Sequence, residues 1–227
     1  MSTDLDAFAR RRDDILGRIA TAARAAGREP ADVSLVGISK KQPDDRIEAA
    51  LAAGHRVFGE NRVQEADGRW QKRRRDYPDL ELRLVGPLQT NKAEQAVALF
   101  DVIETLDREK LARALRKAIG QVGRTPRLYV QVNTGEEEQK SGLLPRDVAS
   151  FLDLVRGEYD FDIEGLMCIP PVGEPAGPHF ALLADLAAAN NVRKLSMGMS
   201  SDYETAVKFG ATSVRVGSAL FGERPSA

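Results

Sequence analysis

The sequence is poor in the residues from which metal and thiol sites are built. Cys168 is the only cysteine, and His55 and His179 are the only histidines. One cysteine excludes an intrachain disulfide and a cysteine-based zinc cluster, and neither histidine lies in a motif with metal-ligand spacing. Cys168 lies in an apolar segment, where a packing thiol is more common than a nucleophile. We therefore expect no metal centre and no thiol catalysis, and we assign both histidines surface or structural roles.

An excess of charge of one sign and a long apolar run are also missing. Lysine and arginine total 33 against 34 aspartates and glutamates, a net charge of -1, so no positive field exists to attract nucleic acid or anionic lipid. The one basic cluster, 72–75, is typical of a solvated helix end. No stretch approaches the ~18 apolar residues of a membrane span, and the acidic start has no signal-peptide pattern. The sequence thus predicts a cytoplasmic protein that binds neither membranes nor nucleic acid.

Short apolar segments alternate with helical patterns along the chain, without an obvious linker, which favours a single domain over 1–227. An amphipathic helix is predicted over about 5–26. Because a helical pattern separates each pair of predicted strands, parallel pairing is expected. No glycine-rich dinucleotide fingerprint follows the first strand, so a (β/α)₈ barrel of the TIM type is favoured, and an open doubly wound sheet is the alternative. The predicted strands are 33–39, 56–59, 82–86, 102–106, 127–133, 163–169, 194–197 and 213–217.

Two lysines follow the first predicted strand. In barrels of this kind the active face lies at the C-terminal ends of the strands. Strand alternation allows only one of Lys40 and Lys41 to point inward, and periodicity does not choose between them. A lysine at a barrel mouth can be a solvated charge, whereas an inward amine can attack an aldehyde.

Serines and glycines follow the last two predicted strands. Ser200 or Ser201 can cap the first turn of a helix, and Gly217 lets backbone N–H groups approach an anion closely. Barrels often bind phosphate at this place. Closure of the barrel would bring Lys40 beside these residues, so an aldehyde trap and a phosphate cradle are expected to share one mouth.

Six motifs occur in one order along nearly the whole chain. They are Gly-Ile-Ser-Lys-Lys-Gln-Pro at 37–43, Phe-Gly-Glu-Asn-Arg-Val-Gln-Glu at 58–65, Val-Gly-Pro-Leu-Gln-Thr-Asn-Lys at 85–92, Val-Asn-Thr-Gly-Glu-Glu-Glu-Gln-Lys-Ser-Gly at 132–142, Gly-Leu-Met at 165–167, and Leu-Ser-Met-Gly-Met-Ser from 195 through Phe-Gly at 221–222. Together they resemble the pyridoxal phosphate homeostasis proteins, which look like the barrel domain of alanine racemase standing alone. The family commonly has a histidine where this chain has Arg83, so any role of that histidine does not carry over.

The resemblance implies a fold-type III barrel that binds pyridoxal 5'-phosphate as a Schiff base on Lys40. It also implies that Ser200, Gly217 and Ser218 hold the phosphate, that Arg215 lies near the ring or the phosphate, and that Asn61 lies close to the cofactor. With Ser201 added from the capping pattern, the candidate cofactor-binding residues are Lys40, Asn61, Ser200, Ser201, Arg215, Gly217 and Ser218.

A racemase needs acid–base groups on both faces of the plane formed by substrate and cofactor. In the alanine racemases the second base is a tyrosine from an additional C-terminal domain, which we do not expect here, and the four tyrosines of this chain are predicted to pack or to lie on the surface. Arg215 beside the pyridine nitrogen would disfavour ring protonation. We therefore favour a carrier that stores, delivers or buffers the cofactor.

Two other functions remain open at this point. The alternative is a weak pyridoxal-phosphate-dependent amino-acid racemase, and an interaction module with a vestigial cofactor has the least support. The partners expected for a carrier are apo-forms of pyridoxal phosphate enzymes, and the chain is expected to be a monomer or a weak dimer.

Overall fold

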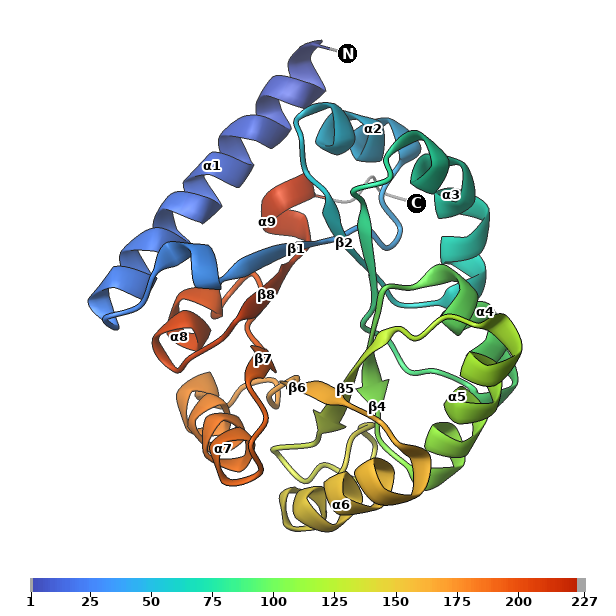
Figure 1. The fold of residues 1–227 in the computed structure, drawn as a ribbon. Coiled ribbons are helices and arrows are strands. Elements are labelled where there is room, and N and C mark those ends of the chain that lie inside the picture. The colour runs from blue at the N-terminus through green and yellow to red at the C-terminus, as the bar shows by residue number, and fades with distance from the viewer. Residues whose placement is uncertain (1, 224–227) are drawn as a thin grey trace.

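The structure is a computed structural model that describes residues 2–223 and contains a closed barrel of eight parallel strands (Figure 1). The ring closes where β1 pairs with β8, in the register Leu35 to Val214. All eight predicted strands are confirmed, with bounds that differ by no more than two residues, and the open-sheet alternative is wrong. The strands are β1 Ser34–Ile38, β2 Val57–Glu60, β3 Glu81–Leu84, β4 Val102–Leu106, β5 Arg127–Val132, β6 Ile163–Cys168, β7 Lys194–Ser196 and β8 Ser213–Val216.

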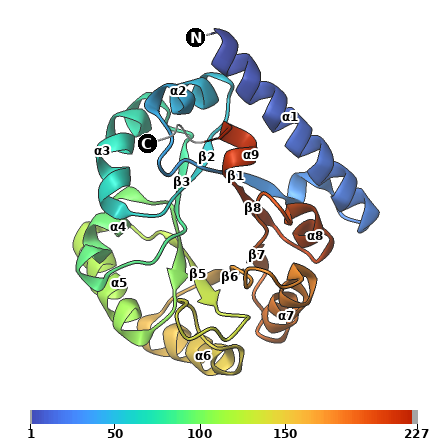
Figure 2. The same ribbon diagram turned by 180° about the vertical axis from the view of Figure 1, so that it is seen from behind.

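Helices surround the barrel, and both views show them outside the ring of strands (Figures 1 and 2). No helix within residues 2–223 is long and apolar enough to cross a membrane. Three short 3-10 turns, η1 Pro30–Asp32, η2 Thr90–Lys92 and η3 Pro145–Asp147, join the main elements. The helices are α1 Ser2–Ala25, α2 Asp44–Ala52, α3 Val63–Asp76, α4 Ala93–Leu99, α5 Glu109–Val122, α6 Val148–Tyr159, α7 Ala176–Ala189, α8 Tyr203–Lys208 and α9 Ser218–Phe221.

The opening helix α1, predicted over 5–26, packs on the outside of the barrel against α2, α8 and α9. Its apolar residues Phe8, Ile15 and Ile19 are buried, as the amphipathic pattern requires. Since α9 directly follows β8, this contact joins the two ends of the described chain beside the point where the barrel closes.

Helix α5 shows how local sequence sets the length of an element. Leu111, Leu115 and Ile119 recur at helical spacing and are all buried. The helix ends at Gly123, whose φ of 72 lies in the left-handed region that glycine adopts without steric cost. The glycine therefore stops the helix where the sequence predicts.

His55 has a structural role. Its ring is 7% exposed, and its Nε2 lies 2.8 Å from the carbonyl oxygen of Val57. It packs edge-on against Phe58, with ring centroids 4.9 Å apart. Burial lowers the pKa of His55 to about 4, although the bond to Val57 opposes this. The imidazole is therefore neutral in the folded protein at neutral pH.

Candidate functional site

One cavity at the C-terminal ends of the strands is lined by six of the seven candidate residues. Its volume is about 200 Å³. Ser201 is exposed and is not part of this lining. The lining residues are Ile38, Lys40, Asn61, Val85, Ile169, Met199, Ser200, Arg215, Gly217 and Ser218.

The structure separates the two lysines that follow β1. Ile38 and Lys40 both line the cavity, whereas Ser39 between them is buried on the other side. Lys41 is exposed and has a φ of 58, so the chain turns at this residue. The side chains therefore keep alternating between the two faces for two residues past the end of β1. Because of this alternation, Lys40, and not Lys41, lies on the side of the cavity.

A buried carboxylate, Glu60, holds the loop that carries Lys40. Its Oε1 accepts hydrogen bonds from Ser39 Oγ at 2.7 Å and from Trp70 Nε1 at 3.0 Å. Arg69 lies 3.4 Å from the same oxygen and donates to the carbonyl of Ser39 at 2.9 Å. Because α3 supplies both Arg69 and Trp70, this helix fixes the backbone next to the candidate lysine.

The backbones that follow β2 and β3 meet closely beside the cavity. A Cβ atom on Gly86 would lie 2.2 Å from the carbonyl oxygen of Asn61, a backbone contact that no side chain could tolerate. Glycine at this position therefore lets the turn after β3 pack against Asn61. The close approach sets where Asn61 stands at the cavity wall.

The helix cap predicted for Ser200 or Ser201 is wrong. The residue at the N-cap of α8 is Asp202, and its Oδ1 accepts a hydrogen bond from the backbone nitrogen of Met199 at 2.6 Å. This bond closes the turn that precedes α8, and no side-chain hydrogen bond caps the first turn of the helix. Within residues 2–223, the side-chain hydroxyls of Ser200 and Ser218 make no hydrogen bond. Both hydroxyls therefore stay available to a ligand in the cavity.

Arg215 is 4% exposed and is anchored on the barrel interior. Its Nη1 donates to Ser196 Oγ at 2.6 Å, and its Nη2 donates to the carbonyl of Cys168 at 2.7 Å. Ser196 in turn donates to Glu104 Oε2 at 2.5 Å, and that carboxylate lies 4.0 Å from Arg215. Glu104 therefore balances the charge of Arg215 and fixes its position through Ser196.

The same carboxylate also binds Arg83, the position at which the sequence departs from the pattern of the family that it resembles. Arg83 Nη1 donates to Glu104 Oε1 at 3.1 Å, and its Nε donates to Glu81 at 2.5 Å. Burial lowers the pKa of Arg83, but the carboxylates of Glu104 and Glu81 outweigh burial and raise it. Arg83 is thus a buried cation with two partners, and it belongs to the polar interior of the barrel rather than to the cavity.

Groups that could perform other chemistry are buried or lie elsewhere. Cys168 is fully buried, and burial raises its pKa to about 12 against the influence of Arg215, so the prediction of a packing thiol is confirmed. Among the described residues, no tyrosine lines the cavity, and no group of three or more histidines, cysteines or acidic residues could hold a metal ion.

Sequence reasoning did not find the supporting roles of Glu60, Arg69, Glu104 and Ser196. A signal did exist for Glu104, because a carboxylate inside an apolar strand such as 102–106 must find a buried partner. The identity of that partner is not a local property, since Ser196 is 92 residues away in the sequence.

Comparisons with known proteins agree with the fold. A family model described as the alanine racemase N-terminal domain matches residues 21–225. A pyridoxal phosphate homeostasis protein of Pseudomonas aeruginosa is 41% identical over 216 residues, which cover 92% of this chain and 93% of the relative. The protein of the same name from Escherichia coli is 32% identical over 216 residues, covering 91% of this chain and 92% of the relative.

Solved structures give the same result. PipY of Synechococcus elongatus with PLP bound is 39% identical and covers 92% of this chain and 100% of its own, with a TM-score of 0.77. An alanine racemase of Clostridium difficile, 17% identical with a TM-score of 0.67, covers 94% of this chain and 57% of its own. This second likeness shows the shared barrel fold alone.

Proposed function

Because this chain belongs to the family of pyridoxal phosphate homeostasis proteins, we propose that it binds pyridoxal 5'-phosphate at the strand ends and stores, delivers or buffers it. One observation carries the proposal: the 200 Å³ cavity places the amine-bearing Lys40 in one lining with Ser200 and Ser218, whose hydroxyls have no hydrogen bond within the described chain. The cofactor supplies an aldehyde that an amine can capture reversibly. A single barrel domain over 1–227 would perform this task.

The cavity residues divide into two groups by chemistry. Lys40 would form the covalent bond. Ser200, Ser218 and the backbone at Gly217 would donate hydrogen bonds to the phosphate, and charge-assisted bonds of this kind are about twice as strong as neutral ones. Arg215 would add positive charge beside the ring or the phosphate. The residues present therefore fit the cofactor in donor type and in charge.

Two candidate residues lie at the edge of this arrangement. Asn61 lines the wall next to Lys40 and would contact the ring. Ser201 adjoins Ser200 on the exposed side, so it would touch only a ligand that extends beyond the cavity.

A cavity of about 200 Å³ is smaller than the ~300–1,000 Å³ typical of ligand sites, so part of the cofactor would stay open to solvent. That openness suits uptake and release.

A carrier is favoured over a racemase because of what lines the cavity. Racemisation needs a second acid–base group opposite Lys40, and such groups typically contribute ~10²- to 10⁴-fold. Tyr203 and Cys168 are buried elsewhere, and Lys41 is exposed and outside the lining. The charge of Arg215 would also weaken the ring as an electron sink. A weak racemase is the alternative function.

The test of cofactor binding is an absorbance spectrum of the purified protein with added pyridoxal phosphate, before and after borohydride reduction, followed by peptide mapping. We expect a visible band that reduction removes, with the label fixed on Lys40. A label mainly on Lys41 would overturn the residue assignment. An unlabelled protein in excess cofactor would overturn the proposal itself.

The test of the carrier role compares transfer with turnover. We expect stoichiometric release of cofactor to an apo-enzyme that requires it. In deuterated water we expect little or no incorporation of α-deuterium into L-amino acids. Multiple-turnover exchange that disappears in Lys40→Ala would favour the racemase instead.

A cytoplasmic location and a monomer or weak dimer are further predictions for this protein.

A further inference from the structure

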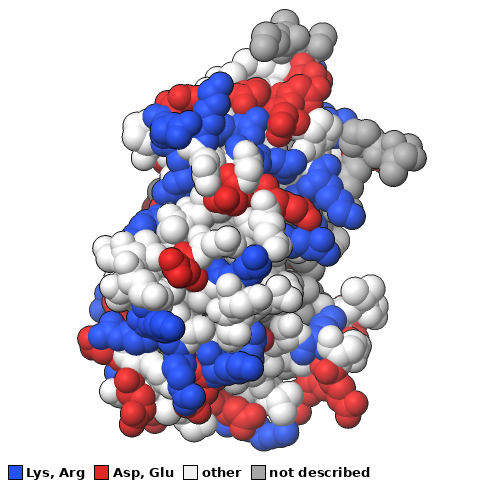
Figure 3. All heavy atoms as spheres, turned by 90° about the vertical axis from the view of Figure 1, so that its right-hand side faces the viewer, with Lys and Arg blue, Asp and Glu red and all other residues white. Residues whose placement is uncertain are grey.

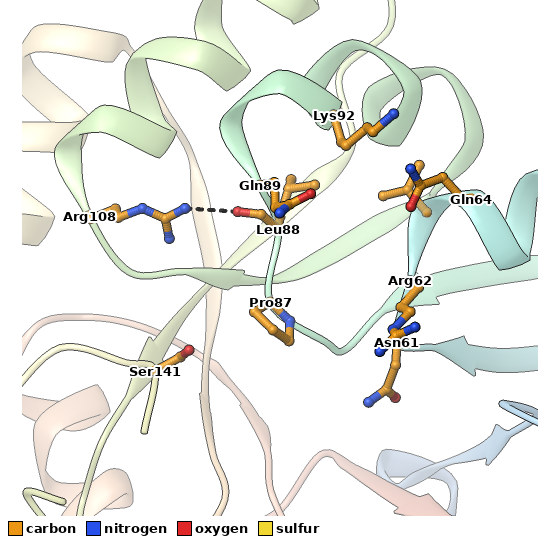
Figure 4. A pocket seen from close by; sticks show the side chains of 10 residues that line it. Asn61, Arg62, Gln64, Pro87, Leu88, Gln89, Lys92, Arg108 and Ser141 are labelled. Atoms are coloured by element: carbon orange, nitrogen blue, oxygen red, sulfur yellow. Dashed lines mark hydrogen bonds between the residues drawn. The ribbon is translucent and has the colours of Figure 1, made fainter. Parts of the chain in front are cut away.

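A second, larger cavity adjoins the one described above. Its volume is about 640 Å³, within the range of small-molecule sites, and it shares the wall residue Asn61 with the first cavity. Figure 4 shows Arg108 and Ser141 on one side, Asn61, Arg62 and Gln64 on the other, and the 87–89 segment between them. The lining residues, called here the cationic groove, are Asn61, Arg62, Val63, Gln64, Pro87, Leu88, Gln89, Lys92, Arg108 and Ser141.

The charged residues that line the cationic groove are all basic. They are Arg62, Lys92 and Arg108, which come from three separate segments of the chain, and no acidic residue of the described chain lines the groove. Gln64 and Gln89 add two side-chain amides. The site therefore offers several hydrogen-bond donors and a positive potential to anything that enters it.

Part of this charge is already balanced, and part is not. Arg62 lies 3.3 Å from Glu65, but both side chains are largely exposed, so the pair is weak. Arg108 pairs with Asp107 and donates to the carbonyl of Leu88 at 2.8 Å (Figure 4). Lys92 makes no ion pair or side-chain hydrogen bond with any of residues 2–223. The groove thus contains an ammonium group whose donors are not used by the described protein.

The surroundings show that the charge is local. On the face of the molecule over α3, α4 and α5, basic and acidic side chains are interspersed (Figure 3). The chain as a whole carries a net charge of -1. This face therefore has no broad positive surface that could bind an acidic macromolecule. Basic residues without acidic neighbours in the same lining occur instead in the groove, where Arg62, Lys92 and Arg108 come together.

We propose that the cationic groove binds a small phosphate-bearing anion, at a site separate from the cavity of Lys40. Phosphate carries up to two negative charges and accepts hydrogen bonds on three oxygens, which matches several donors from different segments better than one carboxylate does. Arg62 and Lys92 are the two residues whose charge the ligand would engage most. The inference stands on the groove alone and does not require the cofactor proposal.

The experiment is a calorimetric titration of purified protein with inorganic pyrophosphate at low ionic strength, where screening is weak. The protein is first labelled with pyridoxal phosphate and reduced with borohydride, so that the cavity of Lys40 is filled, and we expect one saturable site to remain. Lys92→Gln and Arg62→Gln should each raise Kd roughly tenfold or more, since a hydrogen bond between charged groups is lost. A control variant, Lys208→Gln at an exposed lysine of α8, should leave Kd unchanged.

Three results would overturn the proposal. The first is the absence of a saturable site in the parent protein. The second is an unchanged Kd in Arg62→Gln, a variant at an exposed side chain that keeps the test valid even if Lys92→Gln folds poorly. The third is loss of binding in Ser200→Ala alone, which would put the anion in the first cavity. A parallel titration with malonate separates the two anion classes, and an equal affinity for this dicarboxylate would refute the assignment to phosphate.

Discussion

Replacing Glu104 by glutamine tests whether the buried carboxylate holds the interior of the barrel together. Glu104 is fully buried and accepts from Arg83 at 3.1 Å and from Ser196 at 2.5 Å. The change Glu104→Gln keeps the side-chain shape and removes the charge. It leaves Arg83 with one carboxylate, Glu81, and leaves Arg215 without the nearby negative charge that balances it.

The expected loss follows from the burial of these cations. Removing one partner of a buried ion pair typically costs about 3–5 kcal/mol, because the remaining charge stays buried without compensation. For a chain of this size, each kcal/mol lowers Tm by roughly 2–4 °C. We therefore expect a drop in Tm on the order of 6–20 °C, together with weaker retention of any cofactor that depends on Arg215.

The assay is urea and thermal unfolding at pH 7, with Glu94→Gln as the matched control. Glu94 is an exposed residue of α4, and its substitution should change stability by no more than about 0.5 kcal/mol. A loss below about 1 kcal/mol for Glu104→Gln would refute the reasoning. It would mean that Glu81 and Ser196 satisfy the two arginines without the charge of Glu104.

Three further predictions concern the cavity and its surroundings. Replacing both Ser200 and Ser218 by alanine should weaken cofactor retention, at about 1.5–3 kcal/mol per lost bond, without lowering Tm, and retained affinity would place the phosphate elsewhere. The pKa of His55 is about 4 in the folded state, below the ~6.5 of the unfolded chain, so stability present above pH 6.5 is lost as the pH falls toward 4. Between pH 6.5 and pH 4 the free energy of unfolding should therefore fall by about 3 kcal/mol less in His55→Gln than in the parent, as unfolding curves would measure. Cys168 should resist thiol reagents until the protein is unfolded, and rapid labelling of the native protein would contradict its burial.

The fold could be predicted because its signals are local and repeated. Several strands, notably β1 and β5, are short and largely apolar, as expected of parallel strands covered on both faces, and helices stop near glycines such as Gly123. The closing pair of strands, β1 and β8, could be expected only from the count of eight units, because no local pattern encodes the register from Leu35 to Val214.

The sequence could direct attention to six residues that line one cavity, but not to the residues that support them. Strand alternation could not choose between Lys40 and Lys41, because the choice depends on the turn at Lys41, where φ is 58. The cap assigned to Ser200 or Ser201 failed because α8 begins later, at Tyr203, which puts Asp202 at the N-cap. The exact start of a short helix after a loop depends on loop geometry, which the sequence pattern does not specify.

The two carboxylates that support the site argue for its use as a holder of a ligand. Glu60 fixes the loop of Lys40 through Ser39, and Glu104 fixes Arg215 through Ser196. Both acids are fully buried, and neither lines the cavity. Within the described chain, Lys40 and Arg215 are the only titratable residues of the lining. Glu60 and Glu104 instead position other groups, and the lining itself contains the amine of Lys40, the fixed cation of Arg215 and the hydroxyls of Ser200 and Ser218. This set fits the proposed capture and release of a phosphorylated aldehyde, and the described lining includes no second acid–base group opposite Lys40 of the kind that racemisation requires.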